Sequence, residues 1–238
     1  MRRIFLEDLT AAEIKISGEE ARHLAYSLRA KRGDKIIAAD GLGNCAVIEL
    51  TDFDKETIKA RRVGEIKKIS VGEKKIVLAD CLPKQNRFET IIEKATELGV
   101  EKIIPLISER TISRPKDKLE RWRKIAKEAA EQCGRDTIPE VGEIRKLDDW
   151  LKEIFPLKED WLFLFCWELE KETTVREVLS ANEKSNIIVL IGPEGGFSER
   201  EVFEIKNAGG KSASLGKRIL KTDTAAISVL AMINYEFM

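Results

Sequence analysis

Two glycine-containing segments near the C-terminus combine residues that can bind a small molecule. The first reads IGPEGGF over residues 191–197, and the second reads LGKRILKTDTAA over residues 215–226. Each follows a predicted strand and precedes a predicted helix. Glycine lets the backbone approach a ligand closely, and open parallel sheets bind ligands beyond the carboxyl ends of their strands. Two such segments at neighbouring strand ends therefore predict one shared pocket.

The spacing of these glycines argues against a phosphate-binding loop. The chain contains neither G-x-x-x-x-G-K-[ST] nor G-x-G-x-x-G, the patterns that hold phosphates at the start of a helix. A nucleoside-like ligand that is not held mainly through phosphates is therefore favoured. One glycine turn alone is more often an ordinary connection between a strand and a helix, so the prediction depends on the two segments together.

Three ionisable side chains in these segments are candidates for catalysis. Glu194 can accept a proton or bind a ribose hydroxyl, and it is equally compatible with a solvated loop carboxylate. Arg218 can stabilise negative charge on substrate oxygens or bind a phosphate, and it is equally compatible with a surface or interface cation. Asp223 is somewhat better explained as the N-cap of the following helix, a role that Thr222 can also fill.

Alternating strands and helices must position these residues. Apolar runs predict strands at 76–81, 102–107, 161–166, 186–191 and 213–215, and helical periodicity predicts helices at 87–98, 118–133, 175–181, 198–207 and 223–237. Ser198 and Glu201 form a capping-box pattern at the start of one of these helices. Strict alternation is typical of a parallel sheet covered by helices. We therefore predict an α/β domain over residues 73–238.

The first seventy residues have a different pattern. Short apolar runs at 35–40 and 45–50 flank a glycine-rich turn, and 57–63 alternates like a further strand. One helix, introduced by a capping-box pattern at Ser17 and Glu20, interrupts them. We predict a small β-barrel that carries one helix over residues 1–72, so that the whole chain is an α+β protein of two domains.

The overall charge does not indicate nucleic-acid binding, because 42 Lys and Arg residues balance 42 Asp and Glu residues. Any RNA contact must come from local clusters. Residues 114–127 hold seven cations against two acids, and a smaller cluster covers 29–35. A run of cations is more often a solvated face than a binding surface. Arg110 follows a strand end, where facing the pocket and pairing with a neighbouring helix are equally compatible. The candidate RNA contacts are Arg3, Arg29, Lys31, Arg32, Arg110, Arg114, Arg121 and Lys124.

The cysteines and the first residues indicate a cytoplasmic protein. The four cysteines lie far apart with no C-x-x-C, which predicts reduced thiols and neither a disulfide nor a metal site. The first residues become acidic before an apolar core can form, so no signal peptide is expected. The longest apolar stretch, near residues 225–233, is too short to span a membrane.

An ordered set of motifs resembles the 16S rRNA (uracil-N3)-methyltransferase family over essentially the whole chain. The set comprises GPEGGF and LGKRILKTDTAA, together with RFETIIEKATELG at 87–99, SERT at 108–111, EAAEQCGR at 128–135, and the N-terminal RIFL at 3–6 with His23, Leu24, Arg29, Gly33 and Asp34. Any one of these motifs is a weak signal, whereas the ordered set is specific.

The resemblance implies a fold, a cofactor and a reaction. It implies a knotted methyltransferase of the SPOUT superfamily, with an N-terminal PUA-like barrel, a deep C-terminal trefoil knot and a homodimer. It implies S-adenosylmethionine as the methyl donor and uracil N3 of 16S ribosomal RNA, in the small subunit, as the acceptor. The cofactor contacts then fall on Ile191, Gly192, Glu194, Gly195, Gly196, Leu215, Gly216, Ile219, Leu220 and Thr222. The catalytic candidates remain Glu194, Arg218 and Asp223.

One motif departs from the family, and two other functions remain open. The family usually has L-R-T-E-T-A where this chain has Lys221 and Asp223, so a guanidinium fork is lost and one carboxylate is a methylene shorter. A knotted ribose 2′-O-methyltransferase would share the cofactor pocket and differ on the substrate side. A non-catalytic RNA-binding protein with a relic pocket would bind RNA and transfer no methyl group.

Overall fold

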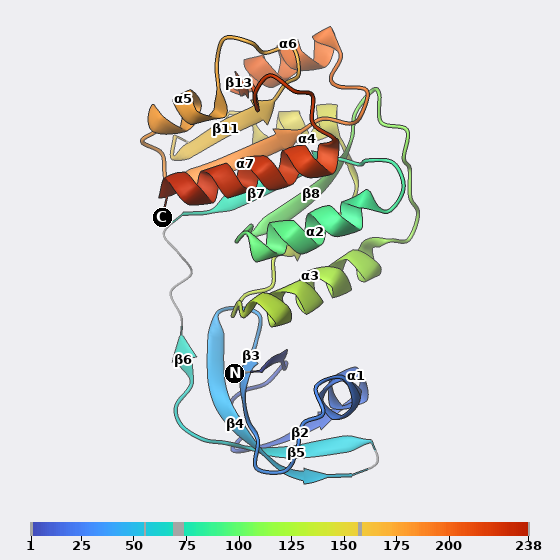
Figure 1. Cartoon of the computed structure of the whole chain (residues 1–238), viewed down its shortest axis with the longest axis vertical. Helices are drawn as coiled ribbons and strands as arrows, with labels where there is room; N and C mark the ends of the chain where they lie inside the picture. The colour runs from blue at the N-terminus through green and yellow to red at the C-terminus, as the bar shows by residue number, and fades with distance from the viewer. Residues whose placement is uncertain (1, 55, 69–73, 157–158, 238) are drawn as a thin grey trace. The chain divides into compact units, whose positions relative to one another are not determined.

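The computed structural model describes residues 2–54, 56–68, 74–156 and 159–237 (Figure 1). The chain divides into two compact units. One comprises Met1–Val71 with Ala130–Ile138, and the other comprises Gly72–Ala129 with Pro139–Met238. The predicted boundary between residues 72 and 73 lies outside the described residues. The return of Ala130–Ile138 to the first unit was not predicted.

The first unit is built on a mixed sheet of six strands. Their order is β1-β3-β4-β5-β2, with β6 paired to β4; β1 and β3 are parallel and the other pairs are antiparallel. The sheet occupies the region where the sequence predicts a small barrel. The strands are β1 (Arg3–Phe5), β2 (Glu13–Ser17), β3 (Lys35–Ala39), β4 (Asn44–Phe53), β5 (Thr57–Arg62) and β6 (Lys67–Lys68).

A short helical segment packs against this sheet. Helix α1 (Gly18–Arg22) continues as a π-helix, η1 (His23–Ser27), and Leu24 is completely buried in the core of the unit. Ser17 is the N-cap, but its side chain makes no capping hydrogen bond, so the predicted capping box is wrong. Gly18 has φ +66, outside the right-handed helical region, so the first turn does not have the regular geometry that a capping box requires.

Residues 130–138 belong to the first unit because they pack and pair with its first strand. Ala130 is fully buried beside Phe5, and Glu131 accepts a hydrogen bond from the Phe5 N–H at 3.2 Å. Arg3 pairs with Asp136 at 2.7 Å without the geometry of a linear hydrogen bond, and the two side chains are only 10% and 12% exposed. Arg3 is thus engaged inside its unit and is not displayed for the RNA contact that the sequence predicts.

The second unit contains a parallel sheet with the order β10-β8-β7-β12-β11-β13, and β9 pairs with β8. Four predicted strands are confirmed, while β9 and β10 were not predicted and β13 lies two residues before its predicted place. Strand β13 ends at Ala213 because this is the last residue that pairs with β11, opposite Cys166. The strands are β7 (Ile76–Cys81), β8 (Lys102–Ile107), β9 (Glu140–Val141), β10 (Arg145–Lys146), β11 (Trp161–Cys166), β12 (Asn186–Ile191) and β13 (Lys211–Ala213).

Helices cover this sheet, as predicted. Helices α2 and α7 lie against each other in front of the strands in Figure 1. Helices α4 and α6 pack against aromatic residues of β11, with Trp150 edge-on to Phe163 at 5.8 Å. Helix α4 was not predicted. The helices are α2 (Arg87–Glu97), α3 (Leu119–Cys133), α4 (Leu147–Ile154), α5 (Val175–Ser180), α6 (Glu199–Asn207) and α7 (Thr222–Phe237).

Burial explains why the central strands were easy to recognise. Every residue of β12 is buried, which is typical of a parallel strand with helices on both faces. The four cysteines are all unpaired, and Cys45 and Cys81 are buried. Across the described ranges, no helix combines the length and apolarity needed to cross a bilayer.

Candidate active site

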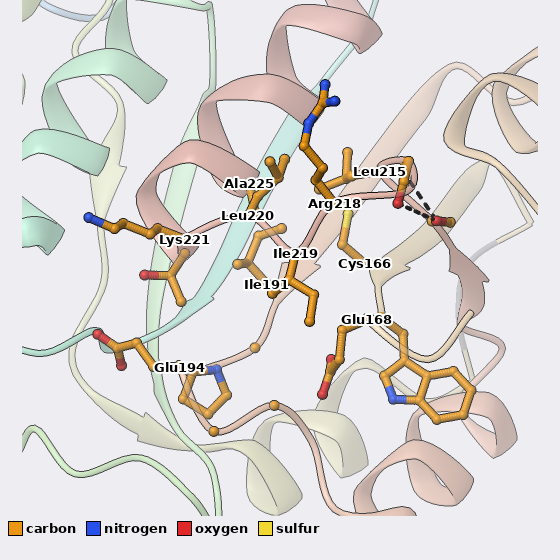
Figure 2. Close-up of a pocket in the computed structure, with 18 of the residues that line it drawn as sticks. Cys166, Glu168, Ile191, Glu194, Leu215, Arg218, Ile219, Leu220, Lys221 and Ala225 are labelled. Carbon is orange, nitrogen blue, oxygen red and sulfur yellow. Dashed lines mark hydrogen bonds between the residues drawn. The ribbon is translucent and has the colours of Figure 1, made fainter. Parts of the chain in front are cut away.

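A cavity of about 480 Å³ lies at the carboxyl ends of β11, β12 and β13 (Figure 2). The two glycine segments form most of its wall, as the strand-end argument predicts. All ten residues predicted to contact the cofactor line it: Ile191, Gly192, Glu194, Gly195, Gly196, Leu215, Gly216, Ile219, Leu220 and Thr222. The predicted meeting of the two segments in one pocket is therefore confirmed.

The cavity also has a third wall that the sequence analysis missed. It is formed by Cys166, Trp167 and Glu168, which follow the end of β11. The signal was present, because 161–166 is itself a predicted strand whose carboxyl end should face the same site. Burial raises the pKa of Cys166 to about 12, which favours the protonated thiol over the more nucleophilic thiolate at neutral pH. The remaining lining residues are Pro193, Ser214, Lys217, Arg218, Lys221 and Ala225.

The first glycine segment is held in a tight turn. The Gly196 N–H donates to the Pro193 carbonyl at 2.9 Å, and Gly196 has φ +66. A Cβ at Gly196 would lie 1.9 Å from Oε1 of Glu168. On the other side, Nη1 of Arg110 donates to the Gly195 carbonyl at 2.9 Å. Position 196 therefore combines a backbone conformation that favours glycine with a close approach of Glu168, which leaves no room for a side chain while the carboxylate stays in place.

The second glycine segment is more open. The Gly216 N–H donates to Oγ of Ser214 at 3.2 Å, and Ile219 is 86% exposed at the rim of the cavity. Helix α7 begins at Thr222, one residue earlier than predicted, and the Thr222 hydroxyl makes no hydrogen bond with the described residues, so it does not act as a cap. Leu215 and Leu220 are partly buried and supply an apolar wall that suits a flat ring.

The three catalytic candidates are not equally placed. Glu194 is exposed in the cavity wall, and its Oε1 accepts a hydrogen bond from the Lys84 N–H at 2.9 Å. Arg218 is also exposed and lines the cavity, with its guanidinium directed away from Glu194 in Figure 2. Asp223 is not a lining residue, and its Oδ1 accepts from the Thr224 N–H at 3.0 Å in the first turn of α7.

A buried carboxyl group, Asp80, lies at the end of β7 and was missed by the sequence analysis. It is 0% exposed, and neither of its oxygens has a hydrogen-bond partner among the described residues. Burial, followed by the negative charges of Glu194 and Asp223, raises its pKa well above the usual range. The available signal was an aspartate inside the apolar run IVLADC, at a strand end next to the predicted pocket.

Asp80→Asn is expected to make the protein more stable at high pH. Because the folded pKa lies above the unfolded one, the wild-type fold is most stable below the unfolded pKa and loses stability as pH rises toward the folded pKa. Each pH unit in that window costs about 1.4 kcal/mol. An amide of the same shape removes this penalty. Urea unfolding at pH 5 and pH 8 should therefore show an advantage of the variant that grows with pH.

The matched control for this prediction is Asp149→Asn on α4. Asp149 is exposed, so the same chemical change there should not reproduce the advantage expected for Asp80→Asn. If Asp80→Asn and wild type lose stability in parallel between pH 5 and pH 8, Asp80 is not held in its neutral form.

The predicted RNA contacts have varied surroundings. Arg29, Lys31, Arg32 and Arg114 are exposed, as an RNA contact requires. Arg121 pairs with Glu89 at 2.7 Å, which joins α3 to α2. Lys124 is exposed and lies 3.9 Å from Glu128 on the same helix. Arg110 is exposed, and its side chain donates to the carbonyl of Gly195 in the glycine turn. The sequence left open whether Arg110 faces the pocket or pairs with a neighbouring helix, and this contact with the turn was not among those alternatives.

Comparisons with known proteins agree on the class of this chain. Residues 71–234 match the family model of an RNA methyltransferase domain. The chain is 33% identical to ribosomal RNA small subunit methyltransferase E of Bacillus subtilis, with 99% of this chain and 97% of the relative aligned. It is 32% identical to the protein of that name from Synechocystis, with 96% and 75% aligned.

Solved structures show the same fold. A ribosomal RNA small subunit methyltransferase E from Neisseria gonorrhoeae, bound to S-adenosylmethionine, superposes with a TM-score of 0.87 at 29% identity, covering 99% of this chain and 97% of that one. A putative methyltransferase from Legionella pneumophila, in complex with the same cofactor, superposes with a TM-score of 0.86 at 28% identity, covering 98% and 96%.

Proposed function

The chain belongs to the RNA methyltransferase family, and we propose that it transfers a methyl group from S-adenosylmethionine to N3 of a uracil in 16S ribosomal RNA. The observation that carries this proposal is the meeting of both glycine segments in one cavity at the carboxyl ends of three parallel strands. Relatives of the same fold are bound to S-adenosylmethionine, which supports the choice of cofactor. The N3 position of the acceptor follows from the motif resemblance.

The residues of the cavity fit this cofactor. Leu215 and Leu220 offer apolar contact to an adenine ring, and Gly192 and Gly195 also line the cavity. Glu168 and Glu194 supply negative charge toward a sulfonium. When bound, the cofactor supplies an activated methyl group. The protein holds donor and acceptor in line, and such positioning lowers a barrier by roughly 7–11 kcal/mol.

The acceptor atom must lose a proton, and two side chains of the cavity suit that requirement. Glu194 has one oxygen bonded to the Lys84 N–H, and its other oxygen makes no hydrogen bond with the described residues, so it can take the N3 proton. Arg218 can stabilise the negative charge that develops on the uracil oxygens. Uracil N3 lies on the Watson–Crick edge, so the target base must be unpaired or flipped out of its stack.

The finer features of the proposal come from the family resemblance. They are a PUA-like barrel in the first unit, a deep trefoil knot in the second, a homodimer, action on the small ribosomal subunit and a cytoplasmic location. Exposed apolar side chains on α7, Met232 at 41% and Tyr235 at 79%, offer surface that a second copy would cover. The four unpaired cysteines agree with a reducing compartment.

The test is methyl transfer from labelled S-adenosylmethionine to small subunits that lack the uracil-N3 modification, with mass identification of the labelled nucleoside. We expect N3-methyluridine. Label on a ribose 2′ oxygen would keep the cofactor and replace the reaction with that of a 2′-O-methyltransferase. Tight RNA binding and cofactor binding without any label would indicate a non-catalytic RNA-binding protein.

A further inference from the structure

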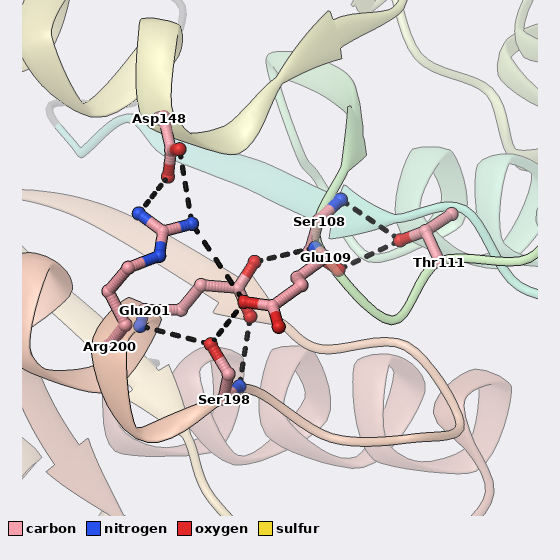
Figure 3. Close-up of polar contacts among 7 residues, drawn as sticks. All are labelled: Ser108, Glu109, Thr111, Asp148, Ser198, Arg200 and Glu201. Atoms are coloured by element: carbon pink, nitrogen blue, oxygen red, sulfur yellow. Dashed lines mark hydrogen bonds and ion pairs between the residues drawn. The ribbon is translucent and has the colours of Figure 1, made fainter.

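A closed set of hydrogen bonds lies beside the cavity and connects two segments that are far apart in sequence (Figure 3). The Glu109 N–H donates to Oε1 of Glu201 at 2.7 Å, and the Ser198 N–H donates to Oε2 of Glu201 at 2.9 Å. The Ser198 hydroxyl donates to Oε2 of Glu109 at 2.8 Å. We call Glu109, Ser198 and Glu201 the carboxylate ring. Glu201 is 1% exposed, so it is the buried centre of this ring.

Helix capping explains only part of the carboxylate ring. In a capping box, the Glu201 N–H donates a hydrogen bond to the Ser198 hydroxyl, and the Ser198 N–H donates one to a carboxylate oxygen of Glu201. Both hydrogen bonds are present. The bond from Glu109 to the second Glu201 oxygen and the bond from Ser198 to Glu109 serve no capping purpose. A buried carboxylate is costly unless its oxygens are hydrogen-bonded, and here each oxygen accepts a backbone N–H. The two additional bonds tie the loop after β8 to the start of α6.

The residues of the carboxylate ring are adjacent in sequence to the first glycine segment and to Arg110. Ser198 directly follows the first glycine segment, and Glu109 directly precedes Arg110, whose Nη1 bonds to the Gly195 carbonyl. The fit is tight, because a Cβ at Gly195 would lie 3.1 Å from Cβ of Arg110. Both ends of the contact between Arg110 and Gly195 are therefore anchored by the same three residues.

The loop that carries Arg110 is also held by hydrogen bonds on its other side. The Ser108 N–H donates to Oγ1 of Thr111 at 3.0 Å, the two hydroxyls lie 2.8 Å apart, and both residues are buried. Arg110 is exposed, and its only hydrogen bond with the described residues uses one of five guanidinium donors. The remaining donors face solvent at the glycine turn, where an anionic group of a ligand can meet them.

We propose that Glu201 is a positioning residue, which sets Arg110 against the first glycine segment so that its free donors bind a backbone phosphate of the substrate RNA. The proposal rests on the proposed function for the identity of the RNA. Arginine suits this task because its planar fork matches two phosphate oxygens. Glu201 touches neither the cavity nor solvent, so its effect on RNA must pass through Arg110.

A double-mutant cycle tests this route. The binding of 16S ribosomal RNA is measured by filter binding for wild type, Glu201→Gln, Arg110→Ala and the double variant. Glutamine keeps one acceptor and leaves one backbone N–H without its partner. Glu201→Gln and Arg110→Ala should each weaken RNA binding about tenfold. In the double variant the second change should add nothing, because Glu201 acts only through Arg110.

One control variant and two further measurements separate positioning from a general loss of structure. Glu199→Gln makes the same substitution in the first turn of α6, at an exposed residue outside the ring, and should leave RNA binding unchanged. Ser198→Ala removes the hydroxyl that reaches Glu109 and should show the same dependence on Arg110 as Glu201→Gln. Arg110→Ala should also reduce the slope of log affinity against log salt by about one, as expected for one lost phosphate contact.

The outcomes distinguish this inference from the proposed function. Additive effects of Glu201→Gln and Arg110→Ala, or unchanged RNA affinity in Glu201→Gln, overturn the positioning role even if methyl transfer is normal. Coupled effects in a protein that binds RNA but transfers no methyl group support the positioning role and overturn the proposed function. A wild-type protein with no affinity for the RNA contradicts both.

Discussion

Replacing Gly196 by valine is expected to weaken the binding of S-adenosylmethionine by about tenfold or more. Gly196 has φ +66, where a side chain costs roughly 1–2 kcal/mol and a β-branched one is a genuine outlier. Its Cβ would also lie 1.9 Å from Oε1 of Glu168, so the carboxylate would have to move. Glu168 lines the cavity, and its displacement changes the shape and charge of the proposed cofactor site. Isothermal titration calorimetry measures the effect directly.

The control is Gly209→Val, which separates backbone strain from damage to the cavity. Gly209 has φ +87 at the end of α6, no atom lies within 4 Å of a Cβ built there, and the residue does not line the cavity. Its replacement should cost stability and leave cofactor affinity unchanged. Equal losses of affinity in the two variants would remove the first glycine turn from the cofactor site. Thermal unfolding of both proteins shows whether either has lost its fold.

Replacing Arg218 by alanine is expected to lower kcat about 100-fold while cofactor affinity stays within a factor of about three. Arg218 is exposed in the cavity wall and forms no ion pair within the described part of the chain, so its charge is available to a substrate. A cation placed where negative charge develops stabilises the transition state more than the ground state. The measurements are single-turnover methyl transfer and calorimetry with S-adenosylmethionine.

Two further variants make the result for Arg218 specific. Lys217→Ala removes a neighbouring exposed cation of the same cavity wall and should lower turnover far less. Arg218→Lys keeps the charge without the planar fork, and partial recovery of kcat would indicate that charge is the main contribution. Equal losses of turnover and cofactor affinity in Arg218→Ala would instead make Arg218 a cofactor-binding or structural residue.

Local sequence predicts the second unit well where each element has a strong signal of its own. The run NIIVLI predicts a strand without ambiguity, and Ser198 with Glu201 predicts the start of α6, where the capping box is confirmed. Helix α4 has a weak signal, because only Leu147, Trp150 and Leu151 form its buried face and its N-cap, Lys146, has no capping side chain. Strands as short as β9 and β10 have no periodicity to read.

The candidate site likewise contains residues with a strong local signal in the sequence and residues without one. The ten residues predicted to contact the cofactor could be placed at one cavity because both glycine segments carry recognisable turns after apolar strands. Glu168 and Asp80 could not be ranked in this way, since their importance comes from neighbours that are distant in sequence. Glu168 matters because it lies against Gly196. Asp80 matters because it is buried and is influenced by the carboxylates of Glu194 and Asp223. Arg3 was misread for the same reason, because its partner Asp136 is 133 positions further along the chain (136 − 3).

The sequence by itself determined the four longest strands and most of the helices of the second unit and the two glycine turns, because these depend on residue types within a few positions of one another. The ordered set of local motifs along the chain indicated the family. Only the tertiary structure decided that the end of β11 joins those of β12 and β13 at the cavity, where β13 ends, and how the carboxylate ring holds Arg110 against Gly195. The physical reason is that strand pairing, burial and the pKa of a buried acid such as Asp80 depend on atoms brought together by folding.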